Sequence, residues 1–136
     1  MKRLFAAALL IATPALAQTP SPAPRAAAEA GTRPQTVEDA CIFVAKSMLM
    51  ARDLKVGVVQ AFPELTPPGA RLTYSTRMDA EEGDITDEIE CQFDAGTSPT
   101  KVTRFCMDST CYASDSEDHE DRRRFEEVQA LMQRLK

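Results

Sequence analysis

Three of the four cysteines of this chain lie close together, in the stretch CQFDAGTSPTKVTRFCMDSTC from Cys91 to Cys111, and the fourth, Cys41, lies far upstream. Four cysteines permit three pairings. A disulfide forms only where two Cα atoms approach to about 4.4–6.8 Å of each other. The cysteine spacing therefore restricts how the elements on both sides of this stretch can pack.

The first residues indicate export. In residues 1–17, MKRLFAAALLIATPALA, two basic residues precede an apolar run that ends in small residues. This order is typical of a secretory signal peptide, and the apolar run is shorter than the roughly 20 residues that span a bilayer. Four cysteines in an exported chain predict two disulfides. We therefore expect a periplasmic or secreted protein with no integral membrane segment after signal cleavage.

The rest of the chain predicts one linker and one domain. Residues 18–35 are rich in proline and alanine and poor in core-forming side chains, which indicates a disordered linker. Residues 36–136 then form a single disulfide-stapled domain of ordinary size. Removal of residues 1–17 takes away two basic residues and no acid, so the formal charge changes from −5 to −7. Such an acidic chain is not expected to bind nucleic acid.

Apolar periodicity predicts a helix at each end of this domain. Thr36 is expected to cap a helix that ends near Leu54, with Cys41 on its buried face. Ser114 and Glu117 have the spacing of a capping box, which predicts a second helix that runs to the C-terminus. The buried stripe of this second helix is expected to contain Phe125, Val128, Leu131, Met132 and Leu135.

Alternating side chains predict strands between the helices. Residues 71–78 alternate strictly, and the alternation resumes at 85–93. A third strand is expected at 101–106 and a short fourth at 111–113, whereas 55–62 fits either a strand or an extended connection. The predicted fold class is α+β: a three- to four-stranded antiparallel meander flanked by an N-terminal and a C-terminal helix. The helix-covered face is expected to contain Leu72, Tyr74, Met78, Ile85, Ile89, Cys91, Phe93 and Val102.

This layout selects one of the three disulfide pairings. Cys41 and Cys91 both point into the interface between helix and sheet, and Cys106 and Cys111 flank a turn that a hairpin can bridge. We therefore expect one disulfide between Cys41 and Cys91 and another between Cys106 and Cys111. Because Cys106 and Cys111 do not form a CxxC motif at a helix start, a structural role is favoured over a redox role.

Symmetric pairing about the turn before the third strand predicts a possible interaction face. If Asp94 faces Lys101, then Glu90 faces Phe105, and the Phe105 ring lies on the uncovered face of the sheet. A lone exposed aromatic is ordinary surface. If neither helix covers this face, however, its residues offer a contact patch for a protein or ligand. The residues of this patch are Arg71, Arg77, Gln92 and Phe105.

The run DSEDHEDRRR at residues 115–124 contains the only histidine, His119. Carboxylate and imidazole together suit several divalent metals, and the ligands here would be Asp115, Glu117, His119 and Asp121. The simpler interpretation is a helix N-terminus, in which acids occupy the first turn and pair with the arginines that follow. The spacing matches neither an EF-hand nor HExxH. We therefore expect no metal and no cofactor.

The sequence also contains two candidate catalytic arrangements. His119 could act as a general base for a serine hydroxyl, although the chain has no GxSxG motif. The serines that could serve as its nucleophile include Ser75, Ser98 and Ser109. Glu88 and Glu90 could form a glycosidase-type carboxylate pair, but both lie on the same face of one strand, where solvated surface is the simpler interpretation.

The sequence thus contains no complete catalytic constellation. We expect an exported, non-catalytic small domain that binds a protein or another component of the cell envelope, or stabilises an assembly. The alternatives are a small hydrolase that depends on His119 and a divalent-metal binder that uses residues 115–121. The hydrolase requires His119 in a pocket near a hydroxyl or acid, and the metal binder requires its ligands to converge.

Overall fold

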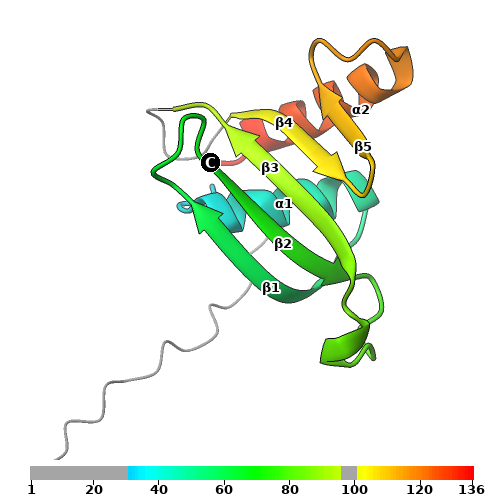
Figure 1. The fold of residues 1–136 in the computed structure, drawn as a ribbon. Coiled ribbons are helices and arrows are strands. Elements are labelled where there is room, and N and C mark those ends of the chain that lie inside the picture. Colours follow the sequence, from blue (N-terminus) through cyan, green and yellow to red (C-terminus); the bar gives the residue numbers. More distant parts are fainter. Residues whose placement is uncertain (1–30, 96–100) are drawn as a thin grey trace, which may run out of the picture.

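The structure is a computed structural model that describes residues 31–95 and 101–136. The predicted signal peptide, most of the predicted linker and Ser98 lie outside the described residues. Within them, two helices accompany a five-stranded antiparallel sheet in which each strand pairs with the next along the chain (Figure 1). The α+β class is confirmed. The predicted number of strands was too low, because the ambiguous residues 55–62 form a strand.

The elements follow one another without crossovers in the sheet. The strands are β1 (Lys55–Phe62), β2 (Gly69–Ser75), β3 (Asp87–Phe93), β4 (Val102–Met107) and β5 (Thr110–Ala113). The helices are α1 (Val37–Leu49), α2 (His119–Gln133) and the short 3-10 turn η1 (Glu82–Asp84).

α1 begins where the sequence predicts and ends earlier. The Thr36 hydroxyl accepts a hydrogen bond of 3.2 Å from the Asp39 amide, which caps the first turn. The helix stops at Leu49, because Met50 adopts a left-handed conformation with φ 52°. The predicted end near Leu54 was therefore wrong.

α2 begins later than its predicted capping box. The Asp118 carboxylate accepts hydrogen bonds from the amides of Glu120 and Asp121, at 2.7 and 3.1 Å, and therefore caps the helix. Ser114 lies before the helix and is exposed. The Ser114 cap was wrong because the helix begins only at His119, where the Asp118 carboxylate caps its first turn, and aspartate is as good an N-cap as serine.

Both helices lie on one face of the sheet, behind it in the view of Figure 1. α1 packs against β1, β2 and β3, whereas α2 packs mainly against β5 and α1. The Gln129 side chain donates a hydrogen bond of 3.2 Å to the Val102 carbonyl, which joins α2 to β4. The largest fully buried side chains of this interface include Phe93, Phe105, Phe125, Leu72, Ile89, Val44, Val102 and Val128.

Both predicted disulfides are confirmed. Cys41 of α1 is bonded to Cys91 of β3, with Cα atoms 5.6 Å apart, and both residues are buried. Cys106 and Cys111 face each other directly in the β4–β5 hairpin, and their Cα atoms lie 4.0 Å apart. One disulfide therefore joins the helical layer to the sheet, and the other closes a single hairpin.

The pairing of β3 with β4 contains an irregularity that the sequence pattern did not indicate. Phe93 faces Val102, but the next residue back along β3, Gln92, faces Arg104. Thr103 therefore has no opposite residue on β3. Such a bulge shifts every residue beyond it by one position relative to the neighbouring strand.

The bulge corrects the predicted location of Phe105. Phe105 faces Cys91 rather than Glu90, and its side chain is fully buried on the helix-covered face. Its ring stacks on Tyr112 and Phe125, with centroid distances of 5.0 and 6.1 Å. The prediction that Phe105 contributes to an exposed patch was wrong, because one unpaired residue reverses the face to which a side chain points.

The β2–β3 hairpin is longer at its tip than predicted. Thr73 faces Glu88 and Arg71 faces Glu90, because the chain forms η1 and a wide loop between the strands. Met78 lies in this loop with an exposed fraction of 59%, so its predicted place in the core was wrong. Ile85, at the far end of the loop, is buried, but its side chain lies beside Gly57 and the Thr73 hydroxyl and is not part of the core beneath the helices, so its predicted place on the helix-covered face was also wrong.

Candidate functional site

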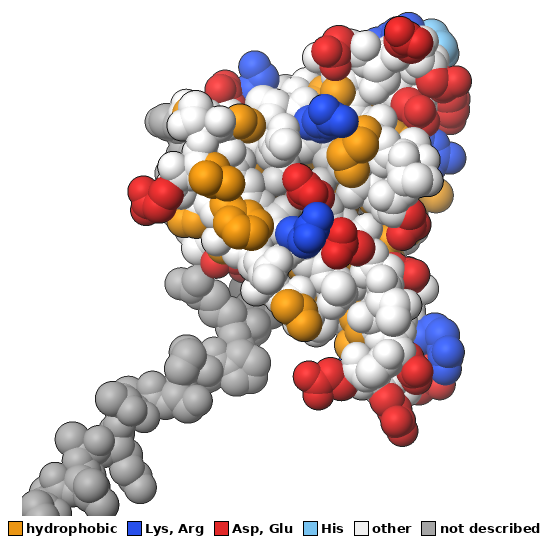
Figure 2. Space-filling view, in the orientation of Figure 1, with side chains coloured by type: hydrophobic (Ala, Val, Ile, Leu, Met, Phe, Trp, Pro, Cys, Tyr) orange, Lys and Arg blue, Asp and Glu red, His pale blue; other side chains and the backbone are white. Residues whose placement is uncertain are grey.

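The uncovered face of the sheet has a charged centre. Arg71 of β2 contacts Glu88 and Glu90 of β3, with nitrogen–oxygen distances of 3.4 Å to each. Figure 2 views this face and shows basic and acidic side chains next to one another near its middle. Exposed pairs of this kind contribute about 0–1 kcal/mol each. The two glutamates therefore share one arginine on a solvated surface.

The four residues of the predicted contact patch do not come together. Arg71 and Gln92 lie on the strands, whereas Arg77 lies in the loop after β2 and pairs with Asp79 at 3.4 Å. Phe105 points to the opposite side of the sheet. The uncovered face thus keeps Arg71 and Gln92 of the predicted patch, but not Arg77 or the aromatic anchor Phe105.

His119 is the first residue of α2, and its side chain is exposed. The Ser75 hydroxyl accepts a hydrogen bond of 3.1 Å from the Arg77 amide at the end of β2. In Figure 1 the end of β2 and the start of α2 lie far apart. Ser109 is exposed in the β4–β5 turn. This placement does not give His119 the pocket that a hydrolase requires.

The acidic run before and within α2 is also open to solvent. Asp115 and Glu117 are exposed, and Asp121 is half-buried. In residues 31–95 and 101–136, no three histidine, cysteine, aspartate or glutamate side chains are grouped so that they could hold a metal ion. Within this run Asp118 instead caps α2, and Glu120 pairs with Arg123 and Arg124, as in the simpler interpretation of the sequence.

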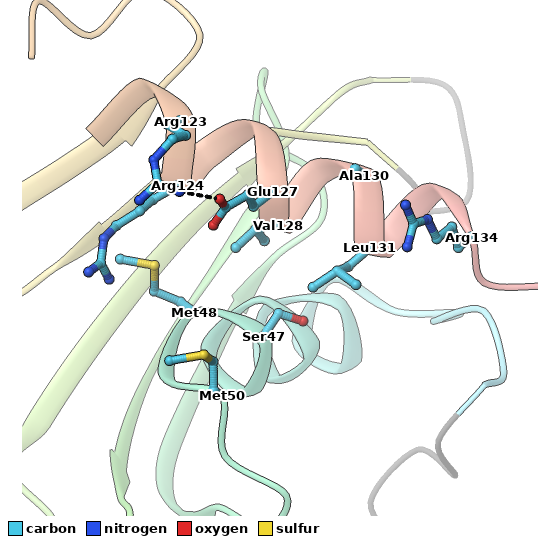
Figure 3. Close-up of a pocket in the computed structure, with 10 residues that line it drawn as sticks. All are labelled: Ser47, Met48, Met50, Arg123, Arg124, Glu127, Val128, Ala130, Leu131 and Arg134. Carbon is cyan, nitrogen blue, oxygen red and sulfur yellow. Dashed lines mark hydrogen bonds and ion pairs between the residues drawn. The ribbon is translucent and has the colours of Figure 1, made fainter. Parts of the chain in front are cut away.

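A groove of about 530 Å³ lies between the C-terminal part of α1 and the outer side of α2. Figure 3 shows the side chains that line it. We call this feature the interhelical groove, and its lining residues are Ser47, Met48, Met50, Arg123, Arg124, Glu127, Val128, Ala130, Leu131 and Arg134. Clefts that bind small molecules commonly have volumes of about 300–1,000 Å³.

The early end of α1 leaves this groove open. The amides of Met50 and Ala51 bond back to the carbonyls of Ser47 and Lys46, at 3.3 and 3.0 Å, and turn the chain away from α2. Met50 consequently projects into solvent with an exposed fraction of 90%. The groove therefore begins where α1 stops.

Apart from the arginines, the groove is lined by apolar side chains together with Ser47 and Glu127, and Glu127 pairs with Arg123. Met48 comes from α1, and Val128 and Leu131 come from α2 and point into the groove (Figure 3). Val128 is buried, whereas Leu131 has an exposed fraction of 42%. Methionine side chains are flexible and polarisable, which suits contact with apolar ligands of varied shape. Together these side chains form a hydrophobic surface that is only partly covered.

Arginines lie at both ends of the groove, with Arg123 and Arg124 near one end and Arg134 near the other (Figure 3). Arg123 contacts Glu120 at 2.5 Å and Glu127 at 2.7 Å. Its hydrogen bond to Glu120 holds the pKa of that carboxyl below its usual value and raises the pKa of the Arg123 guanidinium. The charge of Arg123 is therefore already balanced.

The other two arginines are less engaged. Arg124 lies 3.5 Å from Glu120, a glutamate that already binds Arg123. Arg134 makes no ion pair within the described ranges 31–95 and 101–136. The groove therefore has a local positive charge, although the chain as a whole carries a formal charge of −5. An apolar surface between two cationic ends favours a ligand with an apolar body and an anionic group.

Sequence reasoning did not identify the interhelical groove. The apolar periodicity places Leu131 in the buried stripe of α2, and i, i+4 spacing makes Arg122 and Arg124 partners of the acids Asp118 and Glu120. A signal was present: Arg134 follows the acids of α2 by too many residues to pair with them at i, i+4 spacing. An unmatched arginine beside Leu131 indicates a mixed surface rather than a buried stripe.

Comparison of this chain with family models, with curated proteins and with solved structures found no match. None of the helices in the described residues is long and apolar enough to cross a membrane.

Proposed function

We propose that this protein is an exported, non-catalytic binding module, periplasmic or secreted, and that the interhelical groove binds an amphiphile of the cell envelope. The ligand has an apolar tail and one anionic head, either a carboxylate or a phosphate. The observation that carries this proposal is one groove with apolar walls and arginines at its ends. Two disulfides support an oxidising compartment.

The apolar tail would lie between α1 and α2 against Met48, Val128 and Leu131. Each CH₂ group that leaves water contributes about 0.8 kcal/mol. Leu131 is already partly exposed, so a tail covers hydrophobic surface without opening the core. Met50, at the mouth of the groove, would close over the tail, because its side chain is flexible and almost fully exposed.

The anionic head would bind Arg134 or Arg124. A hydrogen bond between charged partners contributes about 1.5–3 kcal/mol, more than a neutral one. Arg134 fits this role best, because a ligand would not have to displace a glutamate from it within the described part of the chain. The acidic surface elsewhere would repel the same ligand, which restricts binding to the groove.

Fluorescence titration with a dansyl-labelled undecanoic acid tests the ligand class. The bound probe is then displaced with laurate, dodecyl phosphate, dodecanol and dodecylamine, which share a tail and differ in the head. We expect laurate and dodecyl phosphate to displace the probe at lower concentrations than dodecanol, and dodecylamine to be the weakest. If dodecylamine competes as well as laurate, or if the probe does not bind, the proposal is wrong.

Variants of the groove test the location. Arg134→Gln is expected to weaken laurate binding about tenfold, and Leu131→Asp to abolish it, because it places a carboxylate in the apolar wall. Arg104→Gln is the matched control, since Arg104 is an exposed arginine that faces Gln92 on the sheet and is not part of the groove. Equal losses in Arg134→Gln and Arg104→Gln would show that only the net charge matters and would contradict the proposed site.

A further inference from the structure

β1 forms one edge of the sheet, and it pairs only with β2 in the part of the chain that the structure describes. The main-chain groups on the outer side of an edge strand can pair with another strand. Three apolar side chains of β1 are also well exposed, with exposed fractions of 63% for Val58, 40% for Val59 and 41% for Phe62. The edge is therefore apolar as well as unpaired.

The usable part of this edge is short and bounded on both sides. The pairing of β1 with β2 is irregular between Val56 and Val59, where the Val58 amide donates to the Thr73 hydroxyl at 2.9 Å. After Phe62 the chain continues with Pro63, which has no amide hydrogen. Bulges and prolines limit edge pairing in natural proteins. Together these limits leave residues 58–62 available.

The side chains of this stretch are divided between the two faces of the sheet. Val59 and Ala61 pair with residues of β2 whose side chains are buried beneath the helices. Gln60 and Phe62 pair with residues of β2 on the uncovered face, and the exposed side chain of Val58 lies at the other end of the stretch. The stretch is therefore apolar at both ends and polar in the middle.

We propose that two copies of this chain pair antiparallel through β1, with Gln60 facing Gln60 of the second copy. Only a pairing centred on Gln60 uses the whole of residues 58–62 on both chains. It places Val58 opposite Phe62 of the second copy and Val59 opposite Ala61 of the second copy. Aromatic side chains opposite β-branched ones are favourable cross-strand pairs. The result is a two-fold dimer with one continuous sheet.

Charges next to the stretch are compatible with this register. Lys55 begins β1 and Glu64 follows it. In the paired register Glu64, in the turn after β1, lies near Lys55 of the other copy, whose ammonium also donates to the Ala80 carbonyl of its own chain, so opposite charges lie at both ends of the contact. The two copies as wholes repel each other, because each carries a formal charge of −5. We therefore expect added salt to strengthen the dimer, since screening weakens this long-range repulsion.

Sedimentation velocity of the oxidised protein over a range of concentrations tests the association. We expect the mass to rise from one chain to two, and Phe62→Lys to lower the association constant at least about tenfold, because it places two charges in the contact. Met78→Lys is the matched control, since Met78 is an exposed apolar residue of the β2–β3 loop. A protein that stays monomeric at every concentration, or equal losses in both variants, would overturn the proposal.

Engineered cysteines test the register. Residues that face each other across antiparallel strands have Cα atoms about 4.5–5.5 Å apart, within reach of a disulfide. Gln60→Cys is expected to form a covalent dimer on mild oxidation, with both native disulfides intact by peptide mapping. Val58→Cys and Phe62→Cys are expected to cross-link when mixed, and each alone much less. Efficient cross-linking of Phe62→Cys alone would show another register, and the absence of any cross-link would contradict edge pairing.

Discussion

The Cα atoms of Cys41 and Cys91 lie 5.6 Å apart, so a single covalent bond fastens α1 to the central strand of the sheet. The two cysteines are separated by 50 residues, whereas Cys106 and Cys111 are separated by 5. In the chain-entropy model, closure of the longer loop stabilises the fold by about 4 kcal/mol and closure of the shorter one by about 2 kcal/mol. The disulfide between α1 and the sheet is therefore expected to contribute more to the free energy of unfolding than the disulfide of the hairpin.

Removal of each disulfide tests this difference. We expect the double variant Cys41→Ala and Cys91→Ala to lose about 4 kcal/mol of unfolding free energy, because the unfolded chain gains the entropy of a long open loop. The matched control, Cys106→Ala with Cys111→Ala, is expected to lose about 2 kcal/mol. Guanidinium unfolding followed by circular dichroism measures both values. A larger loss in the hairpin variant would contradict the assignment.

Gly69 tests the close contact between β2 and β3. A Cβ atom at this position would lie 2.5 Å from the main-chain oxygen of Cys91, which cannot move without breaking the sheet pairing. We expect Gly69→Ala to destabilise the fold by about 1–3 kcal/mol through this overlap. Gly83→Ala is the control, since a Cβ there meets no atom within 4 Å. Thermal unfolding of the two variants should separate them, and equal melting temperatures would count against the contact.

The alkaline limit of stability is expected to depend on Tyr74. Burial, with a smaller contribution from the nearby Asp108 and Asp87 carboxylates, raises the pKa of Tyr74 from 10.0 to about 12. Below pH 10 the phenol is neutral in both the folded and the unfolded chain. Between pH 10 and about 12 only the unfolded chain ionises, so the free energy of unfolding falls across this window.

Tyr74→Phe removes this ionisation and keeps the ring. The free energy of unfolding, measured by urea titration at a series of pH values, should decline less steeply above pH 10 in Tyr74→Phe than in the native protein. Burial also raises the pKa of Tyr112, so some decline is expected to remain. Identical slopes in the two proteins would exclude Tyr74 as the cause.

Phe105 is expected to behave as a core residue. Truncation of a fully buried phenylalanine costs about 3–5 kcal/mol, because its burial is lost and a cavity remains. We therefore expect Phe105→Ala to unfold at much lower denaturant concentration than the native protein. Leu65→Ala, at a position with an exposed fraction of 59%, is the control and should change stability little. A small effect of Phe105→Ala would contradict the bulge in β4.

The disulfide pairing could be predicted from sequence because it depends on periodicity. Cys41 lies on the apolar stripe of α1, and Cys91 lies on the alternating apolar side of β3, so both point to the same interface. Cys106 and Cys111 flank a short turn, so their approach requires only one hairpin. Neither inference needed the exact ends of the strands.

The face of Phe105 could not be predicted in the same way. Alternation assigns faces only while pairing is regular, and the residues of β4 around Thr103 contain no glycine to indicate a bulge. One unpaired residue was enough to reverse the prediction. The interhelical groove was missed for another reason. Its residues come from two helices far apart in sequence, and it lies where α1 stops at Leu49, a boundary that the sequence pattern did not predict.

The order of the cysteines has a consequence for oxidative folding. The native bonds join the first cysteine to the second and the third to the fourth. If the chain emerges N-terminus first into an oxidising compartment, Cys41 and Cys91 are the first two thiols to become available, and Cys106 and Cys111 follow. Each new pair of thiols is therefore a native pair. Slow reshuffling of wrong disulfides is not needed on this route. The protein is thus expected to mature without help from a disulfide isomerase, although refolding of the fully reduced chain allows wrong pairs to form.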